Sequence, residues 1–401
     1  MTLLFDGFYS ASISTIHLLY IVTLGILTKK LKLIDNSFHR TLSKTVTNII
    51  LPSFIFAQIM LDFRIENYKL IFHALFGCCF LFVFGLIMGF IISKLLRLSK
   101  ARTNFLAAVF STPHTTTMLV ILIPIIGPVL DAVCAKRPEF IVNAQKRGFL
   151  YIVMNSVFSN IWRWSGAYYL IEPEESYEND DYQLINSNEN NTDIVKKEPK
   201  KNYKERDFKD FLKSIINSPL IASLVSLSFT LSTSFQSYFY TPGTVLNDTI
   251  VSVSVMISKS YGFIVMYILG ISFADFIKIG DEDDDISKRN FLTSSDLFWL
   301  SLMKLIIMPL LACPLLVYFY RYFFQEDDVM LFVYLFMASA PSAINIIIIC
   351  SYKKCYVETV SLLMIYMYAA AIITITLQVT FFIWLIAYLN GQNQAQPIPP
   401  V

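Results

Sequence analysis

Two short stretches, STPHTTT at residues 111–117 and SAPSAIN at 339–345, set the fold of this chain. In each, a Ser stands two positions before a Pro, and a polar side chain stands four positions after it. The offset between matching positions is 228 residues throughout. Pro113 and Pro341 remove backbone donors and clash with the preceding turn, so each predicts a break in a helix. We therefore expect an internal repeat with one broken helix in each copy.

The composition places these helices in a membrane. Of the 401 residues, 55% are hydrophobic and only 15% are charged, whereas a soluble domain carries about 25% charged residues. This excludes a soluble enzyme, a disordered chain and a disulfide-stapled secreted protein, and a net charge of +2 argues against a nucleic-acid partner. A span needs about 20 mostly apolar residues. Ten ranges qualify, namely 9–28, 41–60, 70–94, 103–126, 147–170, 212–234, 249–277, 294–320, 329–351 and 358–388.

The ten ranges fall into two sets of five. They predict one five-helix repeat in residues 1–170 and a second in 211–390, followed by a short tail at 391–401. Because five is odd, the second copy enters the membrane from the opposite side. The fold class we expect is an all-α membrane protein with ten transmembrane helices, as two inverted repeats with crossed broken helices 4 and 9. The charged segment 171–210 between them predicts a disordered cytoplasmic loop.

The distribution of basic residues sets the expected orientation. Lys and Arg are more numerous in the short connections that lie on the cytoplasmic side when the N-terminus is outside. Both termini are therefore expected on the non-cytoplasmic side of a multi-pass protein. No basic residue precedes the first apolar run, so no cleavable signal peptide is expected.

The broken helices also predict where a ligand would bind. Inverted repeats with broken helices are typical of secondary transporters, whose site lies near the midplane. The N-terminus of a half-helix carries free N–H groups and a partial positive charge, which suits an anionic group. The candidate binding residues are polar side chains beside prolines, and the candidate hinges are the prolines themselves: Thr115, Thr116, Thr117, Asn345 and Asn48, with Pro52, Pro113, Pro124 and Pro341.

Three other features have competing interpretations. Lys304, in the eighth range, is either a substrate counter-ion or a prop for the crossing helices, or else a Lys that extends to the membrane surface. His114 is interpreted as a packing histidine rather than a proton carrier. The cluster of Trp162, Arg163 and Trp164 is assigned to an interfacial aromatic belt.

A second break in the helix over 103–126 is expected at Pro124.

No catalytic signature is present. The sequence has no GxSxG, no HExxH and no Walker-type glycine-rich loop, and its six Cys do not have a metal-type spacing. We expect no enzyme activity, no cofactor and no metal. The acidic residues considered, Asp62, Glu139, Asp248 and Asp275, lie at or beyond the ends of the ranges. This favours uniport or proton-linked transport over sodium coupling.

Several motifs resemble those of the auxin efflux carrier family, and are closest to its PIN-LIKES branch. Residues 111–126 resemble the fourth-helix crossover, with Thr117 seven positions before Pro124. Residues 341–346, PSAINI, resemble the second crossover. The other similar motifs are KLIIMP at 304–309, the GxxY…IWxY pattern at 148–164, and Asn217-Ser218-Pro219 at the sixth helix.

The resemblance implies an elevator-type carrier with a scaffold group and a transport group. It also implies that Thr117 and Asn345 contact a carboxylate such as indole-3-acetate, and that Pro124 and the backbone around Ile346 form the crossing. It places the protein in the endoplasmic reticulum or another endomembrane rather than the plasma membrane. Thr117 replaces the Asn of the family, and the third helix lacks the Asp/Lys pair of the plant efflux branch. The substrate expected is therefore an auxin-like aromatic carboxylate or a related metabolite.

Other functions remain open at this point. One is a sodium-coupled organic-anion symporter of the bile-acid type, which would want more acidic and amide ligands. Another is a non-transporting sensor that binds a sterol or lipid and signals through 171–210. A channel is the third. The expected partners are a small organic anion and membrane lipids, but no nucleic acid, and a homodimer is left open.

Overall fold

The computed structural model describes residues 2–62, 68–114, 116–134, 144–173, 218–230, 232–282, 291–324, 326–353 and 355–393. Most of segment 171–210 and of the tail 391–401 lies outside these ranges. The helices of the first half are α1 (Thr2–Lys30), α2 (Asn36–Thr45), α3 (Leu51–Asp62), α4 (Tyr68–Leu95), α5 (Lys100–Ser111), α6 (Thr117–Cys134), α7 (Ala144–Trp162) and α8 (Tyr168–Leu170). Those of the second half are α11 (Ser218–Thr230), α12 (Thr233–Tyr240), α13 (Ser252–Ser258), α14 (Tyr261–Glu282), α16 (Ser294–Leu302), α17 (Met308–Tyr322), α18 (Asp328–Ser339), α19 (Asn345–Lys353) and α20 (Val357–Asn393).

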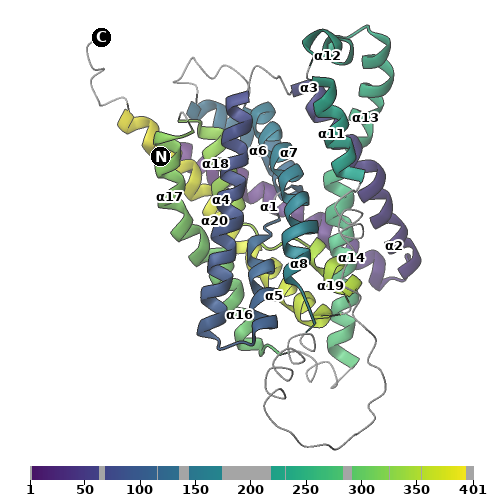
Figure 1. Cartoon of the computed structure of the whole chain (residues 1–401), viewed down its shortest axis with the longest axis vertical. Coiled ribbons are helices and arrows are strands. Elements are labelled where there is room, and N and C mark those ends of the chain that lie inside the picture. Colours follow the sequence, from purple (N-terminus) through teal and green to yellow (C-terminus); the bar gives the residue numbers. More distant parts are fainter. Residues whose placement is uncertain are drawn as a thin grey trace, which may run out of the picture.

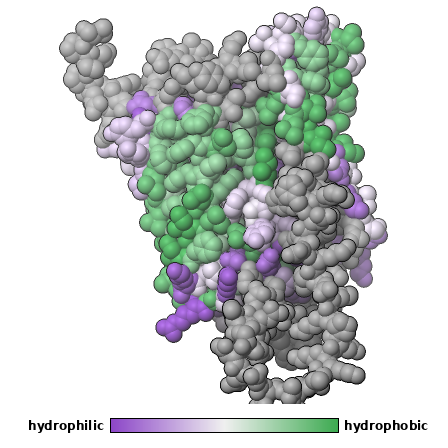
Figure 2. Space-filling view, in the orientation of Figure 1, coloured by the Kyte–Doolittle hydropathy of each residue, from purple (hydrophilic) through white to green (hydrophobic). Residues whose placement is uncertain are grey.

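The surface of the helical body is apolar over a broad band. Figure 2 shows hydrophobic residues along the length of the helices, with hydrophilic residues gathered toward the ends. Large apolar side chains such as Phe72, Ile87 and Leu310 are exposed, as expected for a surface that faces lipid tails. Among the described residues, five helical stretches are long and apolar enough to cross a membrane: Thr41–Leu61, Phe72–Leu95, Asn247–Ala274, Ser294–Tyr322 and Val357–Gly391. The chain is an all-helical, multi-pass integral membrane protein.

The helices differ from the predicted ranges in three places. The range 249–277 is divided by a turn at 259–260 into α13 and α14, and the short helix α12 was not predicted. The second break expected at Pro124 is wrong, because α6 continues as helix through both Pro124 and Pro128. A proline removes one helical hydrogen bond and can kink a helix without ending it.

In the described part of the chain, four turns of π-helix, each of five residues, interrupt the α-helices: Val46–Ile50, Arg163–Ala167, Asn247–Val251 and Met303–Ile307. Two of them are followed closely by a proline, Pro52 and Pro309. Because proline has no N–H, Pro309 cannot bond to the carbonyl of Leu305 four residues earlier. The side-chain amide of Gln378 in α20 donates to that carbonyl instead. Such π-turns are common at functional sites, and the turns at 46–50 and 303–307 contain the candidate residues Asn48 and Lys304.

Two helix pairs approach closely through glycines. A Cβ on Gly270 of α14 would lie 2.1 Å from the carbonyl oxygen of Val22 in α1. A Cβ on Gly85 of α4 would lie 2.5 Å from the carbonyl oxygen of Phe110 in α5. Small residues allow such close backbone contact in membrane proteins. The glycine of α4 thereby fixes the position of the last turn of α5.

The helices form two groups in Figure 1. The helices α2, α3, α11, α12 and α13 lie on one side of the molecule, while α4, α16, α17, α18 and α20 lie on the other. All twelve residues of α18 are buried, so this helix is the core of the second group. The long helix α1 contacts α20 of the second group and also α14, which in turn contacts α2 of the first group, so α1 and α14 together connect the two groups.

Candidate functional site: two paired helix breaks

The two motifs that opened the sequence analysis are breaks between helices. The helices α5 and α18 each have 12 residues and end at Ser111 and Ser339. The helices α6 and α19 begin at Thr117 and Asn345. The offset of 228 residues therefore relates both ends of α5 to those of α18, and the start of α6 to the start of α19. A 12-residue helix is about 18 Å long, which is shorter than the roughly 30 Å of a bilayer core.

The breaks lie side by side and are joined by backbone hydrogen bonds. The N–H of His114 donates to the carbonyl of Pro341 at 2.7 Å, and the N–H of Ala343 donates to the carbonyl of Thr112 at 2.8 Å. Between these two bonds, Pro113 lies opposite Ser342 in an antiparallel bridge. This bridge uses the amides of neighbouring residues only. Pro113 can therefore interrupt the helix without leaving a buried donor unpaired.

The C-terminal end of α5 is held by side chains from three other elements. The Ser342 hydroxyl donates to the carbonyl of Val109 at 2.8 Å, and the Lys304 ammonium donates to the carbonyl of Phe110 at 2.8 Å. The indole N–H of Trp162 donates to the Ser111 hydroxyl at 3.1 Å. The end of a helix carries a partial negative charge and unpaired carbonyls. A buried cation and two neutral donors therefore stabilise the edge of the first break.

Lys304 is fully buried. Its Nζ also lies 3.3 Å from the sulfur of Met308. The interpretation of Lys304 as a side chain that extends to the membrane surface is therefore wrong. Its contacts fit the alternative of a prop for the broken helices.

The other candidate site residues lie inside the breaks, at their ends or farther along the following helix. Pro113 and Pro341 are inside the breaks, while Thr116 is buried at the end of the first break and Thr117 starts α6. Asn345 starts α19 and is half-buried, and the next residue, Ile346, is fully buried. Thr115 lies outside the described residues, and Pro124 lies inside α6.

Asn48 and Pro52 face another part of the molecule. Asn48 is exposed in its π-turn, and its side-chain oxygen accepts a hydrogen bond from the Ser218 hydroxyl at 2.8 Å. Ser218 is the first residue of α11. Pro52 is in the first turn of α3. The contact that the structure gives to Asn48 is therefore with α11 and not with either break.

The assignment of Arg163 to an interfacial belt is wrong, because its side chain is only 7% exposed. It lies in a π-turn beside Trp162, which contacts Ser111 at the first break. Its guanidinium donates to the hydroxyl and carbonyl of Ser159, at 2.9 and 3.1 Å. A single charge well inside the apolar range 147–170 is the signal that could have identified it, since such charges are costly and usually functional.

His114 and Tyr368 connect the breaks to α20. The His114 side chain is buried, and its Nε2 atom has no hydrogen-bond partner. Its ring meets the ring of Tyr368 edge-on, with 5.9 Å between centroids. The Tyr368 hydroxyl donates to the carbonyl of Ser342 at 3.3 Å. Tyr368 therefore contacts both breaks, and sequence reasoning did not identify it.

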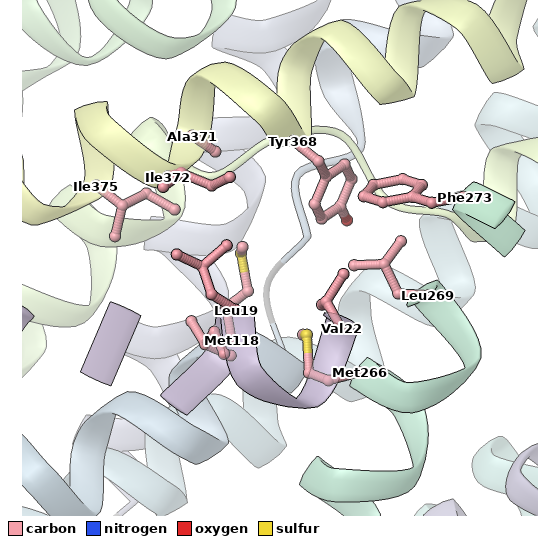
Figure 3. A pocket seen from close by; sticks show the side chains of 11 residues that line it. Leu19, Val22, Met118, Met266, Leu269, Phe273, Tyr368, Ala371, Ile372 and Ile375 are labelled. Atoms are coloured by element: carbon pink, nitrogen blue, oxygen red, sulfur yellow. The ribbon is translucent and has the colours of Figure 1, made fainter. Parts of the chain in front are cut away.

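A cavity extends from Tyr368 between α1, α6, α14 and α20. It contains about 440 Å³ of empty space and is partly open to the outside. Figure 3 shows Tyr368 and Phe273 together at one end, with aliphatic side chains and two methionines along the rest. The lining residues are Leu18, Leu19, Val22, Met118, Met266, Leu269, Phe273, Tyr368, Ala371, Ile372 and Ile375. Ligand sites are commonly lined by apolar side chains with few polar groups.

Two acidic residues that the prediction did not consider are buried. Asp327, the N-cap of α18, forms a buried ion pair with Arg147 and accepts a hydrogen bond from Tyr151. Asp328 accepts from the Tyr320 hydroxyl at 2.7 Å and from the Asn390 amide at 2.9 Å. Both carboxylates thus have protein partners, and they lie just before the predicted range 329–351.

The sequence was compared with known proteins. A family described as "Membrane transport protein" matches residues 10–379. A comparison with curated proteins finds no match. The family match includes both helix breaks, Lys304, Arg163 and every helix that lines the cavity. Because it extends over nearly the whole chain, the chain belongs to this family, the auxin efflux carrier or PIN-like membrane transporters.

Proposed function

We propose that this protein is a secondary carrier that moves a small organic anion by alternating access at the two helix breaks. The observation that carries the proposal is the antiparallel pairing of the breaks, His114 to Pro341 and Ala343 to Thr112, at matching positions of the repeat. Two segments that meet in opposite directions fit an inverted repeat, and the site of such a carrier lies between its repeats. The expected substrate class is an auxin-like aromatic carboxylate or a related metabolite.

The breaks supply positive potential without a metal or cofactor. The helices α6 and α19 begin directly after the paired backbone, at Thr117 and Asn345. A helix N-terminus carries roughly half a unit of positive charge and attracts anions. The Thr hydroxyl and the Asn amide can donate to the same anion. These residues are the first candidates for contact with the charged end of the substrate.

Alternating access requires one group of helices to move against another. In the proposed elevator, α2, α3 and α11–α13 form the scaffold, and the paired breaks move with α4, α16 and α17. The cavity is lined by residues of α1, α6, α14 and α20. Movement at this boundary would open it to alternate sides of the membrane. We place the carrier in an endomembrane with both termini on the non-cytoplasmic side.

One alternative function, the non-transporting sensor, is supported by the residues that line the cavity. The cavity is lined by apolar side chains, with the Tyr368 hydroxyl as a polar group, which also suits a sterol or lipid in a non-transporting sensor. Sodium coupling is less favoured, because Asp327 and Asp328 already have partners within the protein.

Uptake into proteoliposomes tests the proposal. Radiolabelled indole-3-acetate and benzoate would be offered to the wild type, to Asn345→Ala and to a control, Ser228→Ala, whose hydroxyl donates only within its own helix. We expect saturable uptake by the wild type and the control, and a loss of at least tenfold in Asn345→Ala. Binding of these acids or of sterols without any flux would instead support the sensor.

A further inference from the structure

A buried cation lies close to the first break and has no acidic partner in the described part of the chain. The hydrogen bonds of the Arg163 guanidinium both go to Ser159 of its own helix. The other buried arginine of α7, Arg147, is paired with Asp327. Burial of an unpaired charge is unfavourable, so buried charges are normally paired. Arg163 therefore differs from Arg147, because in the described part of the chain it has no anionic partner to offset the cost of burying its charge.

The surroundings of Arg163 contain a second unsatisfied group. Arg163 follows Trp162, whose indole N–H donates to the Ser111 hydroxyl three residues before His114, and its charge acts on the buried His114 ring. Among the described residues, the buried His114 Nε2 atom has no hydrogen-bond partner. An oxyanion next to Arg163 and His114 would neutralise the cation and accept a hydrogen bond from the imidazole. Arginine suits this role, because its planar fork can bind a carboxylate through two hydrogen bonds.

The apolar cavity continues from this polar group. Tyr368 contacts the His114 ring and also lines the cavity, and Met118, near the start of α6, lines it as well. A ligand with a negative head at Arg163 could therefore place an apolar body between α1, α14 and α20. The apolar lining of the cavity suits an apolar ring system.

We propose that Arg163 is the counter-ion for the negative head of the transported molecule, that His114 Nε2 donates to the same head, and that the apolar body occupies the cavity beside Tyr368. This assignment rests on the proposed function and makes it more specific. The ligand class is an amphipathic monoanion, with a single carboxylate or sulfonate at one end of an apolar ring system. Charge selectivity then comes from one side chain in addition to the helix ends.

The test compares a charged probe with its neutral counterpart. Binding of radiolabelled indole-3-acetate and of indole-3-acetamide would be measured on the purified full chain in lipid nanodiscs. We expect the wild type to prefer the acid at least tenfold. Arg163→Gln should bind the amide as the wild type does and lose its preference for the acid, whereas Arg163→Lys should keep part of it. A matched control is Arg321→Gln, which alters an exposed arginine in the last turn of α17.

Different outcomes separate this inference from the proposed function. If Arg163→Gln keeps the preference for the acid, Arg163 is not the counter-ion, although the carrier proposal stands. An equal loss of acid and amide binding in both Arg163 variants would assign Arg163 a structural role and overturn the inference. A second variant, His114→Gln, should weaken acid binding severalfold with no change for the amide. If the wild type neither binds nor transports any acid, the proposed function fails, and this assignment fails with it.

Discussion

The ammonium group of Lys304 lies 2.8 Å from the carbonyl oxygen of Phe110, and both residues are completely buried. The bond links the π-turn Met303–Ile307 to the last turn of α5, nearly two hundred residues away in the sequence. It places a positive charge at the negative end of a helix. The position of the first break thus depends on a side chain from the second half of the chain.

Replacement of Lys304 by Met should separate stability from transport. Lys304→Met removes a buried charge and replaces it with an apolar chain of similar length, so the free energy of unfolding should change by less than about 2 kcal/mol. The carbonyl of Phe110 loses its donor, and the end of α5 becomes less ordered. We expect carboxylate uptake to fall at least tenfold while the melting temperature in detergent changes little. Normal uptake would show that the break does not need this bond.

The pairing of the two breaks can be tested with two serines. Ser342→Ala removes the bond to the Val109 carbonyl in α5, whereas Ser339→Ala removes only bonds within α18, to Leu335 and Phe336. Each loss should cost about 1 kcal/mol of stability. Uptake should decrease severalfold in Ser342→Ala only. Equal uptake by the two variants would contradict a role for the side-chain contact between the breaks.

The buried ion pair should be the most sensitive stabilising contact. Asp327→Asn leaves the Arg147 guanidinium without its partner, which should cost about 3–5 kcal/mol of unfolding free energy. The double variant Arg147→Gln/Asp327→Asn should recover part of that loss, because no charge is then left buried alone. Chemical unfolding in detergent would measure both, with the exposed Asp248→Asn as control. A purely additive double variant would mean that the two side chains are not coupled.

The contact between α1 and α14 should not tolerate a methyl group. In Gly270→Ala the new carbon would lie 2.1 Å from the Val22 carbonyl oxygen, so the helices must separate at a cost of roughly 1–3 kcal/mol. Gly391→Ala is the matched control, since nothing lies within 4 Å of its Cβ position. Replacement of a helical glycine without a clash should be neutral or stabilising by up to about 1 kcal/mol. Thermal unfolding of the two variants should therefore shift in opposite directions.

Filling the cavity should block the substrate without unfolding the protein. Ala371 lines the cavity and is buried, while Ala369 is exposed on the same helix. Ala371→Phe should raise the KM for indole-3-acetate at least tenfold, because the new ring occupies the space of the apolar body. Ala369→Phe should not change it. Unchanged kinetics in both variants would place the substrate elsewhere.

The two helix breaks were readable from sequence because the signal for each is local. The matched spacing around Pro113 and Pro341 predicted two helix breaks, and both are present with the same offset. Their pairing was expected only in outline, since backbone bonds between residues 227 and 231 positions apart leave no mark on the composition or periodicity of the sequence.

The remaining errors have identifiable physical causes. Arg163 stands between two tryptophans, as residues of an interfacial belt do, and only the packing around it reveals its burial. Asp327 and Asp328 precede the apolar run, and because both are charged, the predicted range begins only after them. At Pro124 the surrounding apolar residues favour helix strongly enough for α6 to continue. The π-turns that contain Arg163 and Lys304 have no known periodic signature.

The join between the breaks consists mainly of main-chain atoms. Thr112, His114, Pro341 and Ala343 take part through amides and carbonyls that nearly every residue type possesses. Substitutions at the adjoining positions can therefore change the side chains around the breaks while the main-chain pairing is preserved. In the carrier that we propose, a few such substitutions would be enough to change the cargo, and the different side chains of Thr117 and Asn345 at matching positions illustrate such a change.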